Sequence, residues 1–108
     1  MNYNTLVDFE EIQRLTDIDE KTIEQRTLKL TEEAGELAQA ILSQTNACGC
    51  GYKNKSKQDI TEECLDVIIV ASSIISQNYN NKVDIELIKN IYNKKLQKWK
   101  EKCEKNKS

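Results

Sequence analysis

The fold of this chain is decided by a stretch that occurs twice, LTEEAGEL at residues 30–37 and ITEECLDV at residues 60–67. The two copies match in residue type at every position except Gly35 and Leu65. At about 100° per residue, the second glutamate and the acid three positions later lie beside the apolar stripe of a helix and not opposite it. The repeat therefore predicts two helices that carry the same acidic pattern next to their packing faces.

Apolar periodicity on both sides of this repeat predicts an all-α fold, an antiparallel bundle of four main helices. The third helix is expected to begin at Asp59, with Glu62 reaching back to the backbone of that cap. Its apolar residues surround most of its circumference, which predicts a central helix covered by its neighbours or by a second subunit. The expected ranges of the four helices are Thr5–Leu15, Asp19–Gln44, Asp59–Asn78 and Asp84–Cys103.

The chain is expected to form a single domain over residues 1–108, because 108 residues without a proline suit one compact helical unit. Glycines and lysines gather at residues 46–57, which predicts a flexible loop there, and residues 104–108 are expected to form a basic tail. The apolar residues are mostly Leu, Ile, Val and Ala, so the core is expected to be aliphatic.

The chain contains no histidine, which excludes Ser-His-Asp and Cys-His catalysis, zinc bound through histidine, and the Glu-x-x-His motif of di-iron bundles. The spacing of the four cysteines is atypical of zinc sites and favours free thiols over a metal or redox site. These cysteines are Cys48, Cys50, Cys64 and Cys103. Any chemistry must therefore depend mainly on carboxylates, lysines and hydroxyls.

Charge is distributed unevenly along the chain. Residues 1–81 carry a net charge of −7, and the segment from Lys82 onward carries +5. An acidic body would repel a nucleic acid duplex, so nucleic acid is not the expected partner. The longest apolar run, Val67–Ala71, is too short to span a membrane, which favours a cytoplasmic protein without membrane association.

If the two repeat helices pack antiparallel through their apolar stripes, four carboxylates converge, and like charges that close require a counter-charge. Oxygen ligands without histidine favour Mg²⁺ or Mn²⁺, which leave positions open for substrate phosphates. A nucleoside polyphosphate is then the expected substrate class. The alternative is a solvated charged face, but the duplication of the motif makes that interpretation weaker.

The paired motif, EEAGE at residues 32–36 followed by ECLD at residues 63–66, resembles the EExxE…ExxD signature of the MazG-like all-α nucleoside triphosphate pyrophosphatases. The flanking sequences LKLTEEAGELAQAIL and ITEECLDVIIVASSII are similar to that family as well, so the resemblance covers roughly Phe9 to Trp99. It implies Mg²⁺-dependent hydrolysis of a nucleoside triphosphate to the monophosphate and pyrophosphate, often as housecleaning of the nucleotide pool. It also implies a homodimer or homotetramer, with active sites completed across subunits.

The resemblance also implies roles for individual residues. The residues that match the family's metal ligands are Glu33, Glu36, Glu63 and Asp66. Besides Glu33, the expected catalytic residues are Glu32 and Glu62, which match positions that support the ligands or orient water. One of the carboxylates would accept a proton from the attacking water.

Basic residues for the phosphates can be sought by their helical angle. Lys29 and Arg26 share the acid-bearing face, and Lys95 falls near the centre of the apolar stripe of the last helix. The alternative is that Lys95 extends into solvent and that Lys29 only pairs with Glu33 four positions later.

Other functions fit the same sequence. Within the superfamily, phosphoribosyl-ATP pyrophosphatase and a dUTP or dCTP pyrophosphatase are the alternatives. From a different class, the chain could be a helical interaction module without catalysis, or a nucleic acid binder that uses its basic segment.

Overall fold

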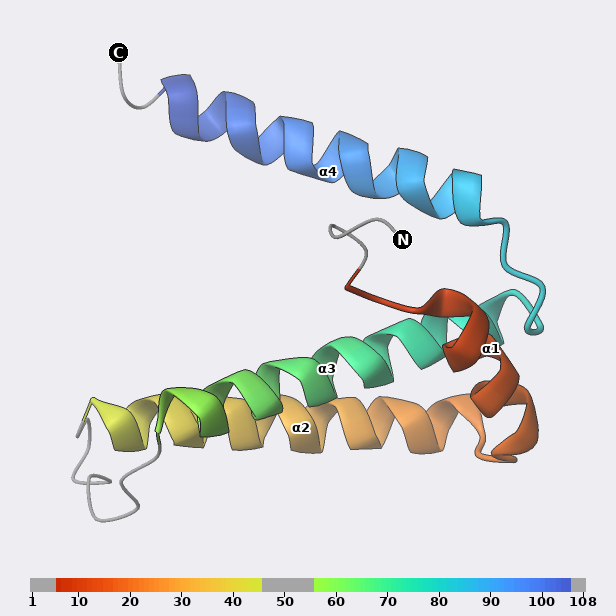
Figure 1. Cartoon of the computed structure of the whole chain (residues 1–108), viewed down its shortest axis with the longest axis horizontal. Coiled ribbons are helices and arrows are strands. Elements are labelled where there is room, and N and C mark those ends of the chain that lie inside the picture. Colours follow the sequence, from red (N-terminus) through yellow and green to blue (C-terminus); the bar gives the residue numbers. More distant parts are fainter. Residues whose placement is uncertain (1–5, 46–55, 106–108) are drawn as a thin grey trace.

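The computed structural model describes residues 6–45 and 56–105. Its elements are α1 (Phe9–Ile18), α2 (Ile23–Gln44), α3 (Lys57–Asn78) and α4 (Ile85–Lys105), as Figure 1 shows. The described part contains helices and no strand, which confirms the all-α fold class with four main helices.

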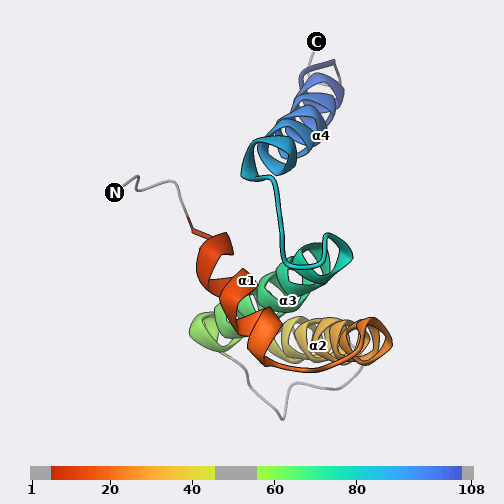
Figure 2. The same ribbon diagram turned by 90° about the vertical axis from the view of Figure 1, so that its right-hand side faces the viewer.

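Helices α2 and α3 form an antiparallel pair, and the shorter α1 packs on α3 near its C-terminal end. Helix α4 has no comparable packing against the other described helices, and it extends away from them in both views (Figures 1 and 2). The body of the molecule is therefore α1, α2 and α3, with α4 as a separate arm.

Most of the buried positions in α2 and α3 carry small side chains. The buried small residues are Ala40, Ser43, Ser72, Ser73 and Ser76. Ala40 is the one buried apolar residue in the described part of the chain, so the prediction of an aliphatic core is wrong for these positions. The branched residues of α3, including Val67, Ile68 and Ile75, are only half-buried.

The predicted start of α2 at Asp19 is wrong by four residues, because Thr22 is the better cap. The Thr22 hydroxyl oxygen accepts a hydrogen bond from the Gln25 backbone N–H at 3.1 Å, and the Gln25 side chain accepts one from the Thr22 N–H at 2.8 Å. This reciprocal capping box satisfies two backbone donors that the first turn would otherwise leave unpaired.

The predicted start of α3 at Asp59 is also wrong, and so is the role given there to Glu62. Ser56 is the N-cap, and Asp59 occupies the third helical position, where its carboxylate accepts from the Ser56 backbone N–H at 2.9 Å. Asp59, which the sequence predicted as the N-cap, is thus the capping-box partner of Ser56, the actual N-cap.

The outer helices also differ from their predicted ranges. Helix α1 runs over Phe9–Ile18 instead of Thr5–Leu15, since the Asp8 side chain caps it by accepting from the Glu11 N–H at 3.1 Å. Helix α4 begins at Ile85, one residue after the predicted start, and ends at Lys105, so it includes the first two residues of the predicted basic tail.

A buried arginine ties the body together. Arg26 is 6% exposed, and its guanidinium donates to the backbone oxygens of Thr16 and Asp19, at 3.3 and 2.6 Å, and to the Gln77 side chain at 2.7 Å. Gln77 in turn donates to the Lys21 backbone oxygen at 3.0 Å. One side chain of α2 therefore links the end of α1, the α1–α2 connection and the end of α3.

The connection between α3 and α4 is anchored on α1. Asn80 and Asn81 have φ values of 54° and 60°, the left-handed region that asparagine tolerates better than most residues. The Asn81 side chain donates to the Asp17 carboxylate at 3.2 Å, and the Val83 N–H donates to the Gln13 side chain at 2.8 Å. These contacts fix the direction in which α4 leaves the body.

Of the predicted loop at 46–57, positions 46–55 lie outside the described residues. The last two positions are Ser56, the N-cap of α3, and Lys57, its first residue. Positions 106–108 of the predicted tail lie outside the described residues as well, as do Cys48 and Cys50. The two described cysteines, Cys64 and Cys103, are free thiols, as predicted. None of the helices in the described part is long and apolar enough to cross a membrane.

Candidate functional site

Three carboxylates meet where the middle of α2 faces the first half of α3. Glu33 and Glu36 come from α2 and Glu63 from α3, and one carboxylate oxygen of each lies within 4.8 Å of the others. Glu33 is buried, Glu63 is half-buried and Glu36 is exposed. The cluster therefore extends from the interior of the helix pair to its surface. We refer to these three residues as the acidic cluster.

Two oxygens of the acidic cluster are buried without a hydrogen-bond donor. They are Oε2 of Glu33 and Oε2 of Glu63. The other oxygen of Glu33 receives the ammonium group of Lys29 at 2.9 Å. Since a buried carboxylate oxygen without a donor is costly, the site has the properties of a binding site for a cation.

The electrostatics of the cluster indicate a deficit of positive charge. The pKa of Glu36 is raised, chiefly by the negative charge of Glu33, with further contributions from desolvation and from Glu63. The pKa of Lys29 is also raised, chiefly by its hydrogen bond to Glu33 and next by the charge of Glu32. Both shifts have the same physical cause, because neighbouring carboxylates favour retention of a proton.

The cluster fits a divalent cation that prefers oxygen ligands. Two oxygens bound to opposite sides of one Mg²⁺ are about 4.2 Å apart, which is close to the upper limit of the spacing in the cluster. The donors are all carboxylates, and no histidine is available in the chain. Such a donor set suits Mg²⁺ or Mn²⁺ better than zinc or copper.

The other predicted acids lie around this cluster. Asp66 is exposed on α3 and is not among the three residues whose oxygens the structure brings within 4.8 Å. Glu32 is exposed and receives Lys29 at 3.6 Å, and Glu62 is exposed and accepts from Gln58 at 3.5 Å. Glu32 and Glu62 are therefore next in sequence to the cluster and open to solvent.

The three predicted phosphate-binding residues are placed differently from one another. Lys29 lies at the cluster and forms an ion pair with Glu33 four positions later, the pairing given above as the alternative to phosphate binding. Arg26 shares its helix but is buried, with its guanidinium hydrogen-bonded to protein acceptors. Lys95 is exposed on α4, the helix that extends away from the body.

Comparison with known proteins identifies the family. The family model described as MazG nucleotide pyrophosphohydrolase domain matches residues 21–104. No curated protein and no solved structure matches the chain. Because the match covers most of the chain, the chain belongs to the family of MazG nucleotide pyrophosphohydrolase domains. Membership supports a nucleotide pyrophosphohydrolase as its general class of activity and a metal-dependent site.

Proposed function

We propose that the chain is a Mg²⁺-dependent pyrophosphohydrolase that converts a nucleoside triphosphate and water into the monophosphate and pyrophosphate. The observation that carries this proposal is the acidic cluster, in which two buried carboxylate oxygens lack a donor. The family supports the reaction class, and the donor set favours Mg²⁺, with Mn²⁺ as the alternative ion. Removal of surplus or modified nucleotides is the cellular role that we propose for this activity.

The ligands in this proposal are Glu33, Glu36 and Glu63, with Asp66 as the fourth. We include Asp66 because it follows Glu63 by three positions on α3, as Glu36 follows Glu33 on α2. Positions three apart on a helix are neighbours on its surface. Both motifs would then present two carboxylates toward one ion.

The reaction breaks the anhydride bond between the α and β phosphates. A bound Mg²⁺ would neutralise phosphate charge and make a nearby water more acidic. Glu32 or Glu62 would accept the proton of that water; both are exposed, and each is next in sequence to a residue of the cluster. The water oxygen bonds to phosphorus, and the bridging oxygen leaves with the pyrophosphate or the monophosphate.

The proposal is tested by ³¹P NMR of standard and modified nucleoside triphosphates incubated with the protein and Mg²⁺. We expect monophosphate and pyrophosphate as products, and their loss in Glu36→Gln. Glu24→Gln is the matched control, because Glu24 is exposed in the first turn of α2, away from the cluster. Wild-type turnover that survives in Glu36→Gln would contradict the assignment of the site.

The same measurement separates the alternative functions. Phosphoribosyl-ATP, dUTP and dCTP belong in the panel, and a marked preference for one of them would identify the corresponding enzyme of the superfamily. An absence of turnover across the whole panel would contradict the proposed activity and favour a helical interaction module.

Lys29 supplies a further prediction that rests on the proposed metal site. Its ammonium group occupies the Glu33 oxygen at 2.9 Å and so competes with an incoming cation. Lys29→Met is expected to bind Mn²⁺ roughly two- to fivefold more tightly, in keeping with the strength of a partly exposed ion pair. The variant is also expected to have a higher KM for the triphosphate. In the wild type, the metal would displace Lys29 from Glu33, and its ammonium group could then bind the phosphates.

Manganese binding to the two proteins can be measured by electron paramagnetic resonance or calorimetry. The control is Lys21→Met, since Lys21 pairs with Asp19 at 3.4 Å, outside the acidic cluster. Weaker metal binding by Lys29→Met would mean that Lys29 only orients Glu33.

We also propose that the enzyme is a homo-oligomer. The support is the scarcity of buried apolar surface in one chain, where Ala40 alone among the described apolar residues is buried. Many large apolar side chains remain exposed, among them Ile69 at 53% and Trp99 at 67%. A single subunit of this kind gains stability by covering these residues with another copy.

A further inference from the structure

A glycine lies inside the helix that supplies two of the three clustered acids. Gly35 stands between Glu33 and Glu36 in the sequence of α2, and it is exposed. Within a helix, glycine is less stable than alanine, because it loses more backbone freedom on folding. Its position beside the acidic cluster therefore requires a physical reason.

Neither backbone conformation nor packing within the chain explains this glycine. Gly35 is a regular residue of α2, and its φ does not lie in the left-handed region. A Cβ atom at Gly35 would meet no atom within 4 Å in the part of the chain that the structure describes, its own helix backbone and its two chain neighbours aside. The glycine therefore leaves open space above α2.

The repeated motif indicates that its acidic pattern does not require a glycine here. The two copies differ in residue type at this one position, where the copy on α3 has Leu65. Leu65 lies in an equally regular helix and is 37% exposed. A large side chain is thus compatible with the pattern on α3, whereas the same position on α2 is left open.

The open space adjoins the exposed acids of the proposed site. Gly35 and Glu36 follow Glu32 by three and four positions, and residues at these spacings are neighbours on a helix surface. All three are exposed. At about 100° per residue, Gly35 lies about 60° from Glu32 and about 160° from the buried Glu33, so it is on the solvent side of these acids. In the proposed function, Glu36 binds the metal and Glu32 is a candidate base, so Gly35 borders the reacting phosphates.

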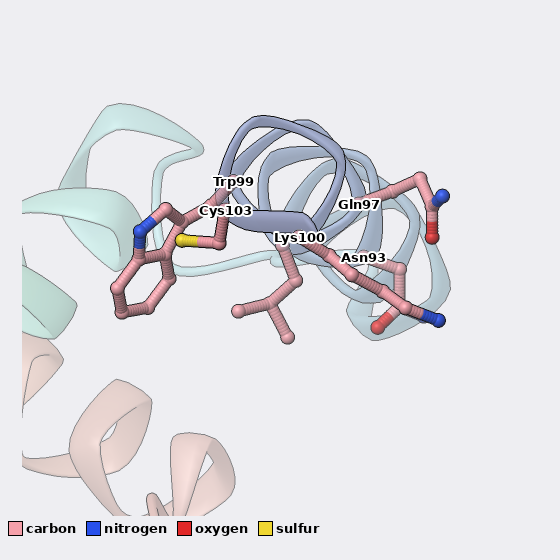
Figure 3. Close-up of a pocket in the computed structure, with 6 residues that line it drawn as sticks. Asn93, Gln97, Trp99, Lys100 and Cys103 are labelled. Atoms are coloured by element: carbon pink, nitrogen blue, oxygen red, sulfur yellow. The ribbon is translucent and has the colours of Figure 1, made fainter. Parts of the chain in front are cut away.

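A hollow on the described part of the chain lies elsewhere, on α4 (Figure 3). Its lining residues are Asn93, Leu96, Gln97, Trp99, Lys100 and Cys103. None of them belongs to the acidic cluster, and α4 extends away from the two helices that hold the cluster. The sugar and base of a nucleotide whose phosphates are held at the cluster would therefore lie on the surface next to it and not in this hollow.

We propose that the sugar and base of the substrate lie across Gly35 while the phosphates are held at the acidic cluster. The N–H and C=O groups in the middle of a helix are already paired with each other, so the bare backbone offers a flat surface and not a hydrogen-bond partner. Such a surface suits an uncharged ring, whereas Glu32 and Glu36 would repel a phosphate. The inference rests on the proposed function and specifies it, because it gives the nucleoside a place beside the metal site.

Gly35→Ala tests the inference, because alanine puts one methyl group into the open space and is the better helix former. We expect the thermal midpoint to rise by roughly 2 to 8 °C. We expect the KM for the triphosphate that the wild type converts fastest to rise at least about tenfold, because the methyl group displaces the nucleoside. Mn²⁺ binding without nucleotide should be unchanged. A variant that is more stable than the wild type cannot lose substrate affinity through damage to its fold.

The two products separate the parts of the substrate. In calorimetry with Mg²⁺, Gly35→Ala should bind pyrophosphate as tightly as the wild type does, since pyrophosphate has neither sugar nor base. It should bind the nucleoside monophosphate more weakly, by a factor similar to the change in KM. Asn90→Ala is the matched control, because Asn90 is an exposed residue inside α4, where alanine also favours the helix. The control should leave the KM and the binding of both products unchanged.

The outcomes distinguish this contact from the proposed activity. Turnover by the wild type with an unchanged KM in Gly35→Ala would overturn the inference and leave the proposed function in place. Triphosphate binding without turnover, weakened in Gly35→Ala, would support the contact and contradict the activity. Equal weakening of both products would overturn the inference, because it would show a general distortion of the site. A changed mass of Gly35→Ala in analytical ultracentrifugation, with an unchanged KM, would overturn it as well and assign the open space to a second copy.

Discussion

Glu63→Gln is expected to abolish nucleotide hydrolysis and, in the absence of metal, to make the protein more stable. The substitution removes one of three carboxylates whose oxygens lie within 4.8 Å of one another. It also replaces the carboxylate of Glu63, whose buried Oε2 has no donor, with an amide whose NH₂ can donate to Glu33 or Glu36. Relief of like-charge repulsion of about 1 kcal/mol would raise the thermal midpoint by roughly 4 to 8 °C.

The loss of a metal ligand should lower kcat/KM at least about a hundredfold. Thermal unfolding with a chelator and ³¹P NMR with Mg²⁺ measure the two effects on the same samples. Glu24→Gln serves again as the control, and it should change neither quantity in this way. A variant that is inactive but less stable than the wild type would mean that Glu63 has a structural role instead.

Arg26→Met is expected to destabilise the body by about 3 kcal/mol, which corresponds to a thermal midpoint lower by roughly 12 to 24 °C. The methionine fills similar space but removes the guanidinium donor from the Thr16 oxygen and the Gln77 side chain. The Asp19 oxygen also loses this donor and keeps the one from the Lys21 backbone N–H at 2.8 Å. Buried acceptors that lose their partner cost more than the original hydrogen bonds contributed.

Arg14→Met is the matched control for this loss. Arg14 is an exposed arginine of α1 that pairs with Glu11, and such surface pairs contribute little. Equal stability of the two variants would contradict the structural role of Arg26. If Arg26→Met fails to fold, Gln77→Leu removes one of the three partners and should give a smaller loss in the same direction.

Much of the acidic cluster could be predicted from the repeated motif. The register of that motif places Glu33, Glu36 and Glu63 beside apolar stripes, and the structure brings their oxygens together. Asp66 has the same register but lies outside the group. The repeated motif by itself predicts that the two helices are equivalent. In the structure α3 packs against both α1 and α2, and the contact with α1 restricts the rotation of α3 relative to α2.

The role of Arg26 could not be predicted from helical angles. Its angle places it near the acids, which suggested phosphate binding, but its partners are backbone oxygens at the end of α1 and beyond it. These oxygens face the guanidinium only once the α1–α2 connection has folded. The signal that the sequence does offer is a charged residue on the packing face of α2 near its start, where a buried charge requires several partners.

The helix starts were missed for a similar local reason. Thr22 and Ser56 each precede a side chain that can complete a capping box, and that pairing decided the boundary more strongly than apolar periodicity did. The four helices themselves follow from periodicity because their apolar residues recur over many turns. The direction in which α4 leaves the body depends on Asn80 and Asn81, whose left-handed conformation leaves little mark on the sequence.

The small-residue contact between α2 and α3 also has a consequence for enzymology. A chain whose described part buries only Ala40 among its apolar side chains gains little hydrophobic free energy by itself. If the chain forms the proposed homo-oligomer, folding and association are linked by mass action, so the fraction of folded protein falls as the sample is diluted. Specific activity at nanomolar enzyme would underestimate the activity of the concentrated protein, and rates are comparable only between samples at one protein concentration.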